Sequence, residues 1–315
     1  MTVCGRCPST GSCCLFTDEV DHVSEPVLNY FHAAPYSPEQ DACIPMLAVC
    51  FDEFVQLQKV FGNRLPFTEE SFVARTQEGR IAGHVGIMPM KAYAGNGKVI
   101  KLAGIASVGV HPDFRKRGIA VQLCENAAKW AEENKYDVLP LYTGLNRVYE
   151  ACGWKNYTVK SVTLENPCFK EKGGCSGSAL TGENKALIIE CYENGAVFPG
   201  KIIREQDTLF HSWKKMFSFS EFTWHVGENG YALEWEDTVA EVFGTGDIAA
   251  LCKNIKRAFL SPSDPAVQAL KAAHWREVAV NDNHPEFWHG ENAMIRPVAE
   301  KEFPEDIFFS LADKF

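Results

Sequence analysis

The sequence contains few positive charges for its length and no long uninterrupted run of apolar residues. Its 315 residues include 31 Lys and Arg against 41 Asp and Glu, which gives a formal net charge of −10. Because nucleic-acid binding needs a basic surface, this excess of acid argues against nucleic acid as a partner. An acidic protein suits a cationic partner such as an amine, although many globular proteins are equally acidic.

Signals that direct a chain to a membrane are also missing. No apolar run reaches the roughly 18 residues of a membrane-spanning helix, so we expect no membrane span. The first residues hold no basic stretch followed by an apolar run, so we expect no secretion signal. We therefore predict a cytoplasmic protein whose 12 cysteines are mostly reduced.

Some of these cysteines are crowded at the start of the chain, namely Cys4, Cys7, Cys13 and Cys14. Four thiolates can hold zinc or an iron–sulfur cluster. The spacing matches no established zinc pattern, so we predict no metal site there. A metal or redox sensor built on this cluster is kept as an alternative function.

The length favours two domains rather than one, and an apolar fraction of 46% is enough for packed cores. Residues 166–184 are rich in Gly, Ser and charge, which is typical of a linker. We therefore predict a cysteine-rich tail at 1–21, a first domain at 22–165, this linker, and a second domain at 185–315.

The hydrophobic pattern predicts a mixed α+β structure in both domains. In the first domain we expect a helical region at 36–61, strands at 72–76, 81–90 and 99–110, a helix at 118–134 and a strand at 137–143. In the second domain we expect strands at 186–192, 222–226 and within 231–243, and a helix at 247–260.

A short basic loop lies between the third strand and the amphipathic helix of the first domain. Pro112 stops the strand, and Arg115, Lys116 and Arg117 bring three positive charges. A helix N-terminus exposes free backbone N–H groups and a partial positive charge, so it can hold an anion. Gly118 lets the backbone come close to that anion. The pattern indicates a pyrophosphate site, with a solvated basic turn as the alternative.

Two motifs carry a family resemblance. Residues 108–120 read V-x-V-x-P-x-x-R-x-x-G-x-A, and residues 149–154 read Y-x-x-x-G-W. Together they resemble the acetyl-CoA signature and the closing segment of the GNAT N-acetyltransferase superfamily. The resemblance implies a GNAT fold of α/β/α layers, with a mixed and mostly antiparallel sheet, over about residues 36–165.

The part of the chain after the linker resembles a second, degenerate GNAT-like domain. It has no R-x-x-G-x-A motif, so we do not expect it to bind CoA. The short link before Tyr149 and the long C-terminal extension are similar to those of the enhanced-intracellular-survival family.

The superfamily resemblance implies a site for acetyl-CoA as co-substrate. The backbone around Val108 would bond the pantetheine and acetyl group, and a backbone N–H there would be the oxyanion donor. The implied CoA-binding residues are Val108, Gly109, Val110, Arg115, Lys116, Arg117, Gly118, Ile119, Ala120 and Asn146. The offset of Asn146 from Tyr149 departs from the commonest pattern. Tyr149 would be the general acid toward the departing sulfur, with core packing beside Trp154 as its alternative role.

No general base stands out in the sequence. His84 and a carboxylate acting through water are candidates, and a buried, hydrogen-bonded imidazole is the alternative for His84. His111, beside the basic loop, is expected to be positional. In the enhanced-intracellular-survival family the terminal carboxylate is the base, which would be that of Phe315. This chain lacks the length for that family's third domain, so we leave Phe315 out of the predicted site.

We therefore predict an acetyl-CoA-dependent N-acetyltransferase that acts by direct transfer. The expected acceptor is a small polyamine, an aminoglycoside-like compound or a lysine side chain, and exposed apolar residues of the second domain are compatible with self-association. One alternative is an aminoacyl-transferase of the tandem-GNAT type, but those enzymes lack the pyrophosphate loop. Another is a CoA-binding sensor without catalytic activity.

Overall fold

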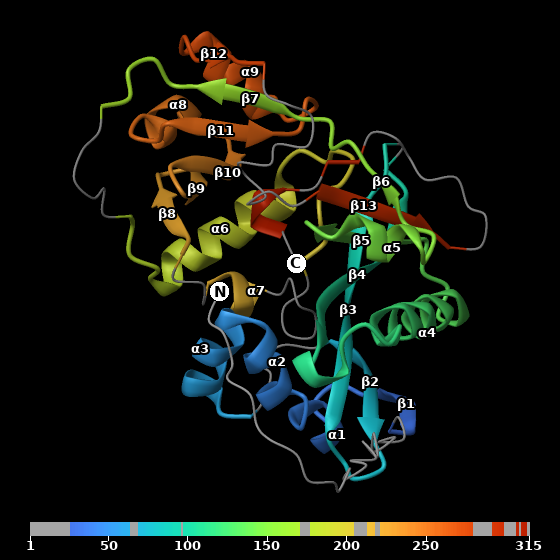
Figure 1. Cartoon of the computed structure of the whole chain (residues 1–315). Helices are drawn as coiled ribbons and strands as arrows, with labels where there is room; N and C mark the ends of the chain where they lie inside the picture. The colour runs from blue at the N-terminus through green and yellow to red at the C-terminus, as the bar shows by residue number, and fades with distance from the viewer. Residues whose placement is uncertain are drawn as a thin grey trace, which may run out of the picture.

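The computed structural model describes residues 26–63, 69–95, 97–170, 177–204, 213–217, 221–279, 292–298, 307–308 and 310–313. Two β-sheets organise these residues, and each has helices on both of its faces (Figure 1). The predicted α+β class with mixed, mostly antiparallel sheets is confirmed, because each sheet holds one parallel strand pair among antiparallel ones.

The first sheet contains seven strands. In spatial order they are β1 (Leu28–Ala33), β2 (Glu70–Thr76), β3 (Ile81–Tyr93), β4 (Val99–Val110), β5 (Val138–Thr143), β13 (Asn292–Pro297) and β6 (Lys155–Asn156). Its parallel pair is β4 with β5. The predicted strands of the first domain therefore exist.

Helices cover both faces of this sheet. One face packs against three short helices, α1 (Pro38–Asp41), α2 (Ile44–Cys50) and α3 (Asp52–Phe61), which occupy the predicted helical region. The other face packs against α4 (Ile119–Glu133), whose Ile119, Leu123 and Ala127 are buried. Helix α5 (Asn146–Glu150) follows β5. The apolar residues of α4 recur every three or four positions, which explains its single buried face.

The second sheet contains six strands. In spatial order they are β12 (Arg276–Glu277), β7 (Val162–Glu165), β11 (Arg257–Leu260), β10 (Thr238–Gly244), β9 (Gly230–Trp235) and β8 (Thr223–Val226). Helix α6 (Gly182–Asn194) packs on one face, and α8 (Ile248–Cys252) and α9 (Pro265–Ala272) pack on the other. Short segments α7 (Trp213–Met216) and η2 (Leu311–Asp313) complete this half.

Two predictions in the second half are wrong. Residues 186–192 form part of helix α6, capped by the Thr181 side chain, and not a strand. Its buried Ile188 and Tyr192 lie four positions apart, as on one helical face. The predicted helix at 247–260 ends at Cys252, and its last residues form β11, where three consecutive residues are buried. A strand covered on both faces has no alternation to reveal it.

The two sheets exchange strands across the predicted domain boundary at 165. Strand β7 precedes that boundary, yet it pairs with β11 and β12 of the second sheet. Strand β13 comes from the C-terminal part, yet it pairs with β5 and β6 of the first sheet. The division into domains at 165 stays a prediction. The strand pairing shows that each sheet includes a strand from the other side of this boundary.

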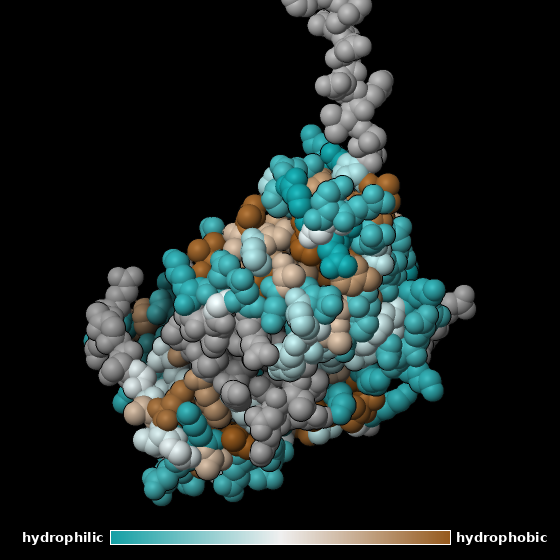
Figure 2. Space-filling view, turned by 90° about the horizontal axis from the view of Figure 1, so that it is seen from below, coloured by the Kyte–Doolittle hydropathy of each residue, from teal (hydrophilic) through white to brown (hydrophobic). Residues whose placement is uncertain are grey.

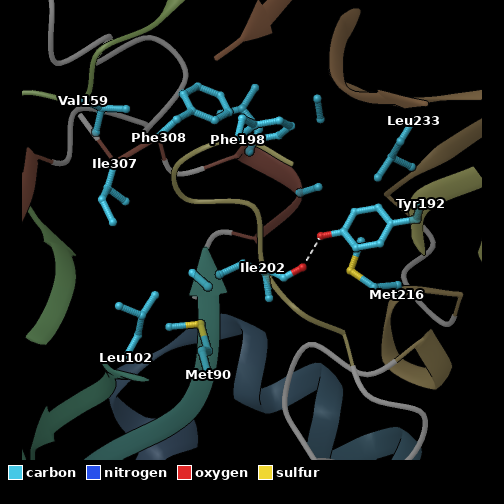
Figure 3. Packing of buried hydrophobic residues seen from close by; sticks show 14 of the residues in the cluster. Met90, Leu102, Val159, Tyr192, Phe198, Ile202, Met216, Leu233, Ile307 and Phe308 are labelled. Carbon is cyan, nitrogen blue, oxygen red and sulfur yellow. Dashed lines mark hydrogen bonds between the residues drawn. The ribbon is translucent and has the colours of Figure 1, made fainter. Parts of the chain in front are cut away.

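One apolar cluster joins the two halves (Figure 3). Met90 and Leu102 reach it from the first sheet, and Tyr192, Leu233 and Phe308 reach it from the second half. The Tyr192 hydroxyl donates a hydrogen bond of 2.5 Å to the Ile202 carbonyl within it. Burial of this shared apolar surface holds the two halves together, because separating them would expose it to water.

Figure 2 shows the molecule from below, from the end where α1 lies in Figure 1. The coloured residues on this face are mainly hydrophilic. Hydrophobic residues there form small, separate groups. In the described part of the chain, no helix combines the length and the apolar character that crossing a membrane requires.

A cluster of buried charges lies beside the shared core. The Arg204 guanidinium donates two hydrogen bonds, of 2.9 and 2.5 Å, to the Glu241 carboxylate, which also accepts one from the Tyr231 hydroxyl. Lys201 donates to the Tyr192 carbonyl at 2.6 Å. Asp264 caps helix α9 by accepting from the Ala266 N–H at 2.8 Å. Pairing of this kind is what permits charges to be buried.

Asp264 gives a prediction of pH-dependent stability. Burial raises the pKa of Asp264 to about 6, from an ordinary value near 3.8, against the effect of the Ala266 N–H. The native state therefore holds this proton more tightly than the unfolded chain, so the stability it contributes is lost as pH rises from about 4 through 6. Asp264→Asn keeps a capping oxygen without the charge. We expect the free energy of unfolding of this variant, relative to that of wild type, to rise by up to about 3 kcal/mol between pH 4 and pH 7.

Urea unfolding at both pH values measures this gain. The exposed Asp247 caps α8 through the Ala250 N–H in the same way, so Asp247→Asn is the matched control and should show no such pH-dependent gain. An equal effect of Asp264→Asn at pH 4 and pH 7 would contradict the prediction.

Candidate active site

The site begins with an irregularity in strand β4. Pairing with β3 matches His84 to Gly109 and Gly86 to Ala106, so β4 holds one extra residue in between, which is a β-bulge. Ser107 within it has a φ of 52°, in the left-handed region that costs a non-glycine residue about 1–2 kcal/mol. No sequence signal pointed to Ser107, since serine is not typical of positive φ.

Strands β4 and β5 stop pairing before this bulge. Within the described stretch 97–170, their parallel register pairs Leu102 with Val138 and no later positions. On its other edge, strand β5 pairs along its whole length with β13. The last residues of β4, including Val108 and Val110, therefore have main-chain groups on the β5 side that take no part in the β4–β5 ladder. In parallel sheets, ligands bind where neighbouring strands part at their carboxyl ends.

The basic loop follows directly and is held by local contacts. A 3₁₀ turn, η1 (Pro112–Phe114), buries the Phe114 ring beneath the Arg80 guanidinium, 5.0 Å from the ring centre. Arg80 also pairs with Asp113 at 2.7 Å. His111 accepts a hydrogen bond from the Asp113 N–H at 3.3 Å, a contact consistent with its predicted positional role.

The N-terminus of α4 faces outward from this loop. Gly118 precedes the helix with a φ of 73°, and no side chain caps the helix here. A Cβ on Gly118 would meet no atom within 4 Å, so glycine serves its backbone conformation and leaves open space in front of the helix. The first N–H groups of the 15-residue helix lack intrahelical acceptors and point into that space.

Positive charge surrounds this helix end. The side chains of Arg115, Lys116 and Arg117 are all exposed. Arg115 Nε donates to the Val110 carbonyl at 3.1 Å, which folds the guanidinium over the end of β4. Arg117 donates to the Asp113 carbonyl at 3.3 Å. The structure thus brings the predicted residues 108–120 together as one strand end, one basic loop and one open helix N-terminus.

The first three helices form a wall on the other side of β4. A Cβ at Gly109 would come within 3.2 Å of the Phe51 ring and 3.3 Å of the Cys50 sulfur, so this wall packs tightly on the glycine and would have to shift for a larger residue. Cys50 Sγ lies 3.6 Å from the Val110 carbonyl. The α2–α3 junction therefore closes over the strand end, next to the place where β4 and β5 part.

Tyr149 lies on α5, on the β5 side of the opening. It is 8% exposed, and its ring meets that of Trp154 edge to face at 6.2 Å. Trp154 donates from Nε1 to the Leu139 carbonyl at 2.9 Å, which anchors the segment on β5. The ring contact is the packing that the sequence offered as an alternative role for Tyr149. A general-acid role remains a prediction.

Asn146 is used to fasten α5 to neighbouring strands. Its Nδ2 donates to Asn156 Oδ1 at 2.8 Å, and its Oδ1 accepts from Asn292 Nδ2 at 3.4 Å. Both ends of the amide therefore bond within the protein, which supports a structural role for Asn146 beside the predicted CoA contact.

Strand β13 holds the Tyr149 segment from the other side. Arg296 donates to the Cys152 carbonyl at 2.6 Å and to both oxygens of Glu125 on α4 at 3.1 and 3.2 Å. Its guanidinium also lies over the Trp154 ring, 5.2 Å from the centre. A residue far along the sequence thus joins α4 to the end of α5, and no local pattern identified it.

His84, the candidate base, is enclosed in the sheet–helix interface. It is fully buried, and its Nδ1 and Nε2 lie 2.9 and 3.0 Å from the Ser107 carbonyl and the Ser71 hydroxyl. Burial lowers the pKa of His84 to about 4. A substrate amine cannot touch this ring in the structure, so the imidazole is a hydrogen-bonded interior residue.

The remaining candidates lie elsewhere. The N-terminal cysteines and Phe315 fall outside the described residues. Among the residues that the structure describes, no group of three or more His, Cys, Asp or Glu side chains is placed to hold a metal ion. The seven cysteines in that part of the chain are free thiols.

Comparison with known proteins agrees with this geometry. A family model described as an acetyltransferase (GNAT) domain matches residues 37–156. No curated protein matches the chain in sequence.

Solved structures extend the likeness to both halves. A GCN5-related N-acetyltransferase from Anabaena variabilis superimposes with a TM-score of 0.55 at 16% identity, covering 86% of this chain and 73% of that chain. Eis1 from Mycobacterium abscessus gives 0.53 at 13% identity, covering 86% and 74%. A probable N-acyltransferase from Enterococcus faecalis gives 0.54 at 13% identity, covering 86% and 73%. At these identities the likeness concerns the fold.

The contact of Arg296 with the Tyr149 segment gives a stability prediction. Arg296→Met keeps the aliphatic stem and removes the donors to Cys152 and Glu125. We expect the free energy of unfolding to fall by about 1–3 kcal/mol, because a main-chain carbonyl of a buried residue loses a charged donor. Urea unfolding measures it.

Lys129→Met is the control, since Lys129 is exposed and lies 3.9 Å from the exposed Glu133 on the same helix. That pair should contribute less than about 0.5 kcal/mol. Equal effects of the two substitutions would show that Arg296 does not fasten α4 to α5.

Proposed function

We propose that this chain, which carries a GNAT acetyltransferase domain at residues 37–156 and so uses acetyl-CoA, moves the acetyl group onto a primary amine by direct transfer. The observation that supports this most is the parting of β4 from β5 beside the open N-terminus of α4. The end of β4 can then hold an extended thioester, and the N-terminus of α4 next to it can hold a diphosphate.

The residues at the α4 N-terminus fit a pyrophosphate. Gly118 leaves the space in front of the helix free, and no side chain competes for the first N–H groups. Arg115, Lys116 and Arg117 supply exposed positive charge around them. Backbone N–H groups and cationic side chains of this kind bind phosphate oxygens through charge-assisted hydrogen bonds.

The last residues of β4 fit the reacting end of the substrate. Main-chain groups of Val108, Gly109 and Val110 would bond the pantetheine arm as an added strand. We assign the Val108 N–H as donor to the carbonyl oxygen, where negative charge develops as the amine attacks the carbonyl carbon. When the carbon–sulfur bond breaks, the acetyl group remains on the nitrogen and the thiolate needs a proton.

Tyr149 is our candidate for supplying that proton. It follows β5, the strand from which β4 parts, so the gap lies between Val108 and the Tyr149 segment. A phenol, whose ordinary pKa is near 10, is a reasonable proton donor to a departing thiolate. We assign no general base, because His84 is enclosed.

The acceptor is proposed only by class. A protonated amine is attracted by an acidic protein with a net charge of −10. A small polyamine, an aminoglycoside-like compound and a lysine side chain all meet this condition. The second half would shape the acceptor pocket as an accessory domain. The cytoplasmic location and self-association stay predictions.

Release of CoA thiol from acetyl-CoA against a panel of these amines tests the function. With a good acceptor, we expect Tyr149→Phe to lower kcat by roughly 10²–10⁴-fold, the usual contribution of general-acid catalysis. Arg115→Ala should raise KM for acetyl-CoA by roughly tenfold, since a hydrogen bond to a charged group contributes about 1.5–3 kcal/mol.

Binding of acetyl-CoA without turnover on any amine would favour a CoA sensor instead. An unchanged kcat in Tyr149→Phe would leave Tyr149 with its packing role alone. Failure to bind acetyl-CoA would overturn the proposal.

Gly118 gives a separate prediction for cofactor binding. Gly118→Ala forces a Cβ into a left-handed conformation, which should lower stability by about 1 kcal/mol and shift the helix N-terminus. We therefore expect acetyl-CoA affinity to fall at least roughly tenfold, the effect of losing one charge-assisted hydrogen bond. Isothermal titration calorimetry measures it.

Gly62→Ala is the matched control. Gly62 has a φ of 67° and free space around it, but it ends α3, away from the basic loop. It should lose similar stability and keep its acetyl-CoA affinity. Equal losses of affinity would attribute the Gly118 effect to general destabilisation.

A further inference from the structure

We propose that buried His84 and Ser71 are positioning residues that aim the Val108 N–H at the reacting carbonyl, through the hydrogen bond from His84 to the Ser107 carbonyl. The inference rests on the proposed function, since it gives the bulge of β4 a task in acetyl transfer. It names residues outside both sequence motifs, and it assigns His84 a role other than that of a base.

Four hydrogen bonds form a chain from Tyr36 to Ser107. The Tyr36 N–H donates to Gln40 Oε1 at 2.8 Å, and Gln40 Nε2 lies 3.0 Å from Ser71 Oγ. Ser71 Oγ lies 3.0 Å from His84 Nε2, and His84 Nδ1 lies 2.9 Å from the Ser107 carbonyl oxygen. The chain crosses from the turn before α1 through β2 and β3 to the bulge of β4.

The direction of every hydrogen bond in this chain follows from its two ends. A carbonyl oxygen can only accept, so His84 Nδ1 must carry the hydrogen toward Ser107. In a neutral imidazole Nε2 then accepts, and its donor is the Ser71 hydroxyl. Ser71 Oγ in turn accepts from the Gln40 amide. The four hydrogen bonds therefore all run in one direction, from the Tyr36 N–H toward the Ser107 carbonyl. This direction fixes the tautomer of His84.

Burial keeps this arrangement in place. Gln40, Ser71 and His84 are each fully shielded from solvent. Burial also lowers the pKa of His84 to about 4, so the ring is neutral near pH 7. Water cannot replace a broken link at such a depth, so breaking one leaves an unsatisfied polar group at a cost of about 1–3 kcal/mol.

Planarity of the peptide bond transmits this contact to Val108. The Ser107 carbonyl and the Val108 N–H belong to one peptide unit, and the described chain has no cis peptide. In a trans unit these two groups point in opposite directions. A carbonyl held toward His84 therefore turns the Val108 N–H away from His84. Val108 follows the bulge, at the end of β4 that β5 leaves free.

The strained backbone makes such support necessary. Ser107 adopts its left-handed conformation without being glycine, so the bulge could relax if nothing held it. The hydrogen bond from His84 and the packing of Cys50 and Phe51 over Gly109 both act on this short segment. Oxyanion donors work only when their direction is fixed before the reaction.

Glu69 is the titratable group that faces this chain of hydrogen bonds. Its carboxylate is buried, with Oε1 3.6 Å from His84 Nε2, and a Cβ at Gly86 would come within 2.7 Å of Oε2. Gln40 Nε2 also donates to the Glu69 carbonyl at 2.8 Å. Gly86 thus provides the room for Glu69, and Gln40 ties the start of β2 to the same chain.

A matched pair of substitutions separates positioning from packing. Asparagine and leucine have nearly the same shape, but only the asparagine amide can replace Nδ1–H as donor to the Ser107 carbonyl. We expect His84→Leu to lower kcat by roughly 10–100-fold, less than the 10²–10³-fold for complete loss of an oxyanion donor. His84→Asn should keep kcat within about threefold of wild type. The Kd for acetyl-CoA should change less than about threefold in both, since the pyrophosphate loop is untouched.

A second readout does not depend on activity. In protein labelled with [¹⁵N]valine, the Val108 amide signal should move in His84→Leu and stay close to the wild-type position in His84→Asn. Ser71→Ala, which removes only the donor to Nε2, should move it in the same direction by less and also serves if His84→Leu does not fold.

The outcomes separate this inference from the proposed function. Equal kcat values for the leucine and asparagine variants, or an unmoved Val108 signal in both His84→Leu and Ser71→Ala, would overturn the positioning role. If wild-type protein releases no CoA thiol with any amine, the proposed function fails, and the Val108 signal still decides whether His84 sets the direction of that amide.

Discussion

One residue in an unfavourable backbone conformation, Ser107, sets the direction of the peptide unit on which the proposed reacting end depends. Its left-handed φ lies within a bulge of β4, in the part of that strand that no longer pairs with β5. Main-chain groups of this part of β4 therefore face the gap on the β5 side. The basic loop and helix α4 follow the same strand, so the proposed pyrophosphate site lies beside the gap. Sheet irregularities often lie next to active sites for this reason.

The gap can persist only because other strands and helices hold its two sides. Strand β5 gains its second partner from β13, a strand that comes from beyond residue 290 in the sequence. Arg296 on that strand ties α4 to the end of α5, and the shared apolar cluster holds the two sheets together. The acetyltransferase sheet is therefore incomplete without the C-terminal part of the chain. This gives the second half a structural task whatever its part in acceptor binding.

Local patterns made much of the first half predictable. The strands at β2 to β4, their turns and helix α4 follow from periodicity, Gly and Pro, which act over a few residues. Residues 186–192 were predicted as a strand but form part of a helix. The helical spacing of four between Ile188 and Tyr192 lies within an apolar run that is equally compatible with a strand. Strand β11 misled because its residues are buried on both faces. The insertion of β13 and the chain from Gln40 to Ser107 join distant residues, and no local pattern records such pairings.

The two ends of the candidate site also differ in this respect, because one depends on local contacts and the other on contacts between distant residues. The proposed diphosphate end depends on consecutive residues, Arg115 to Gly118, whose conformation and charge are set within one loop, so a motif suffices to predict it. The reacting end depends on a peptide direction set by side chains from three separate elements. Changes in the loop should therefore act on affinity for acetyl-CoA, and changes in the buried chain should act on turnover. A motif reveals where such a substrate is held, whereas the geometry that makes it react has to be read from the fold.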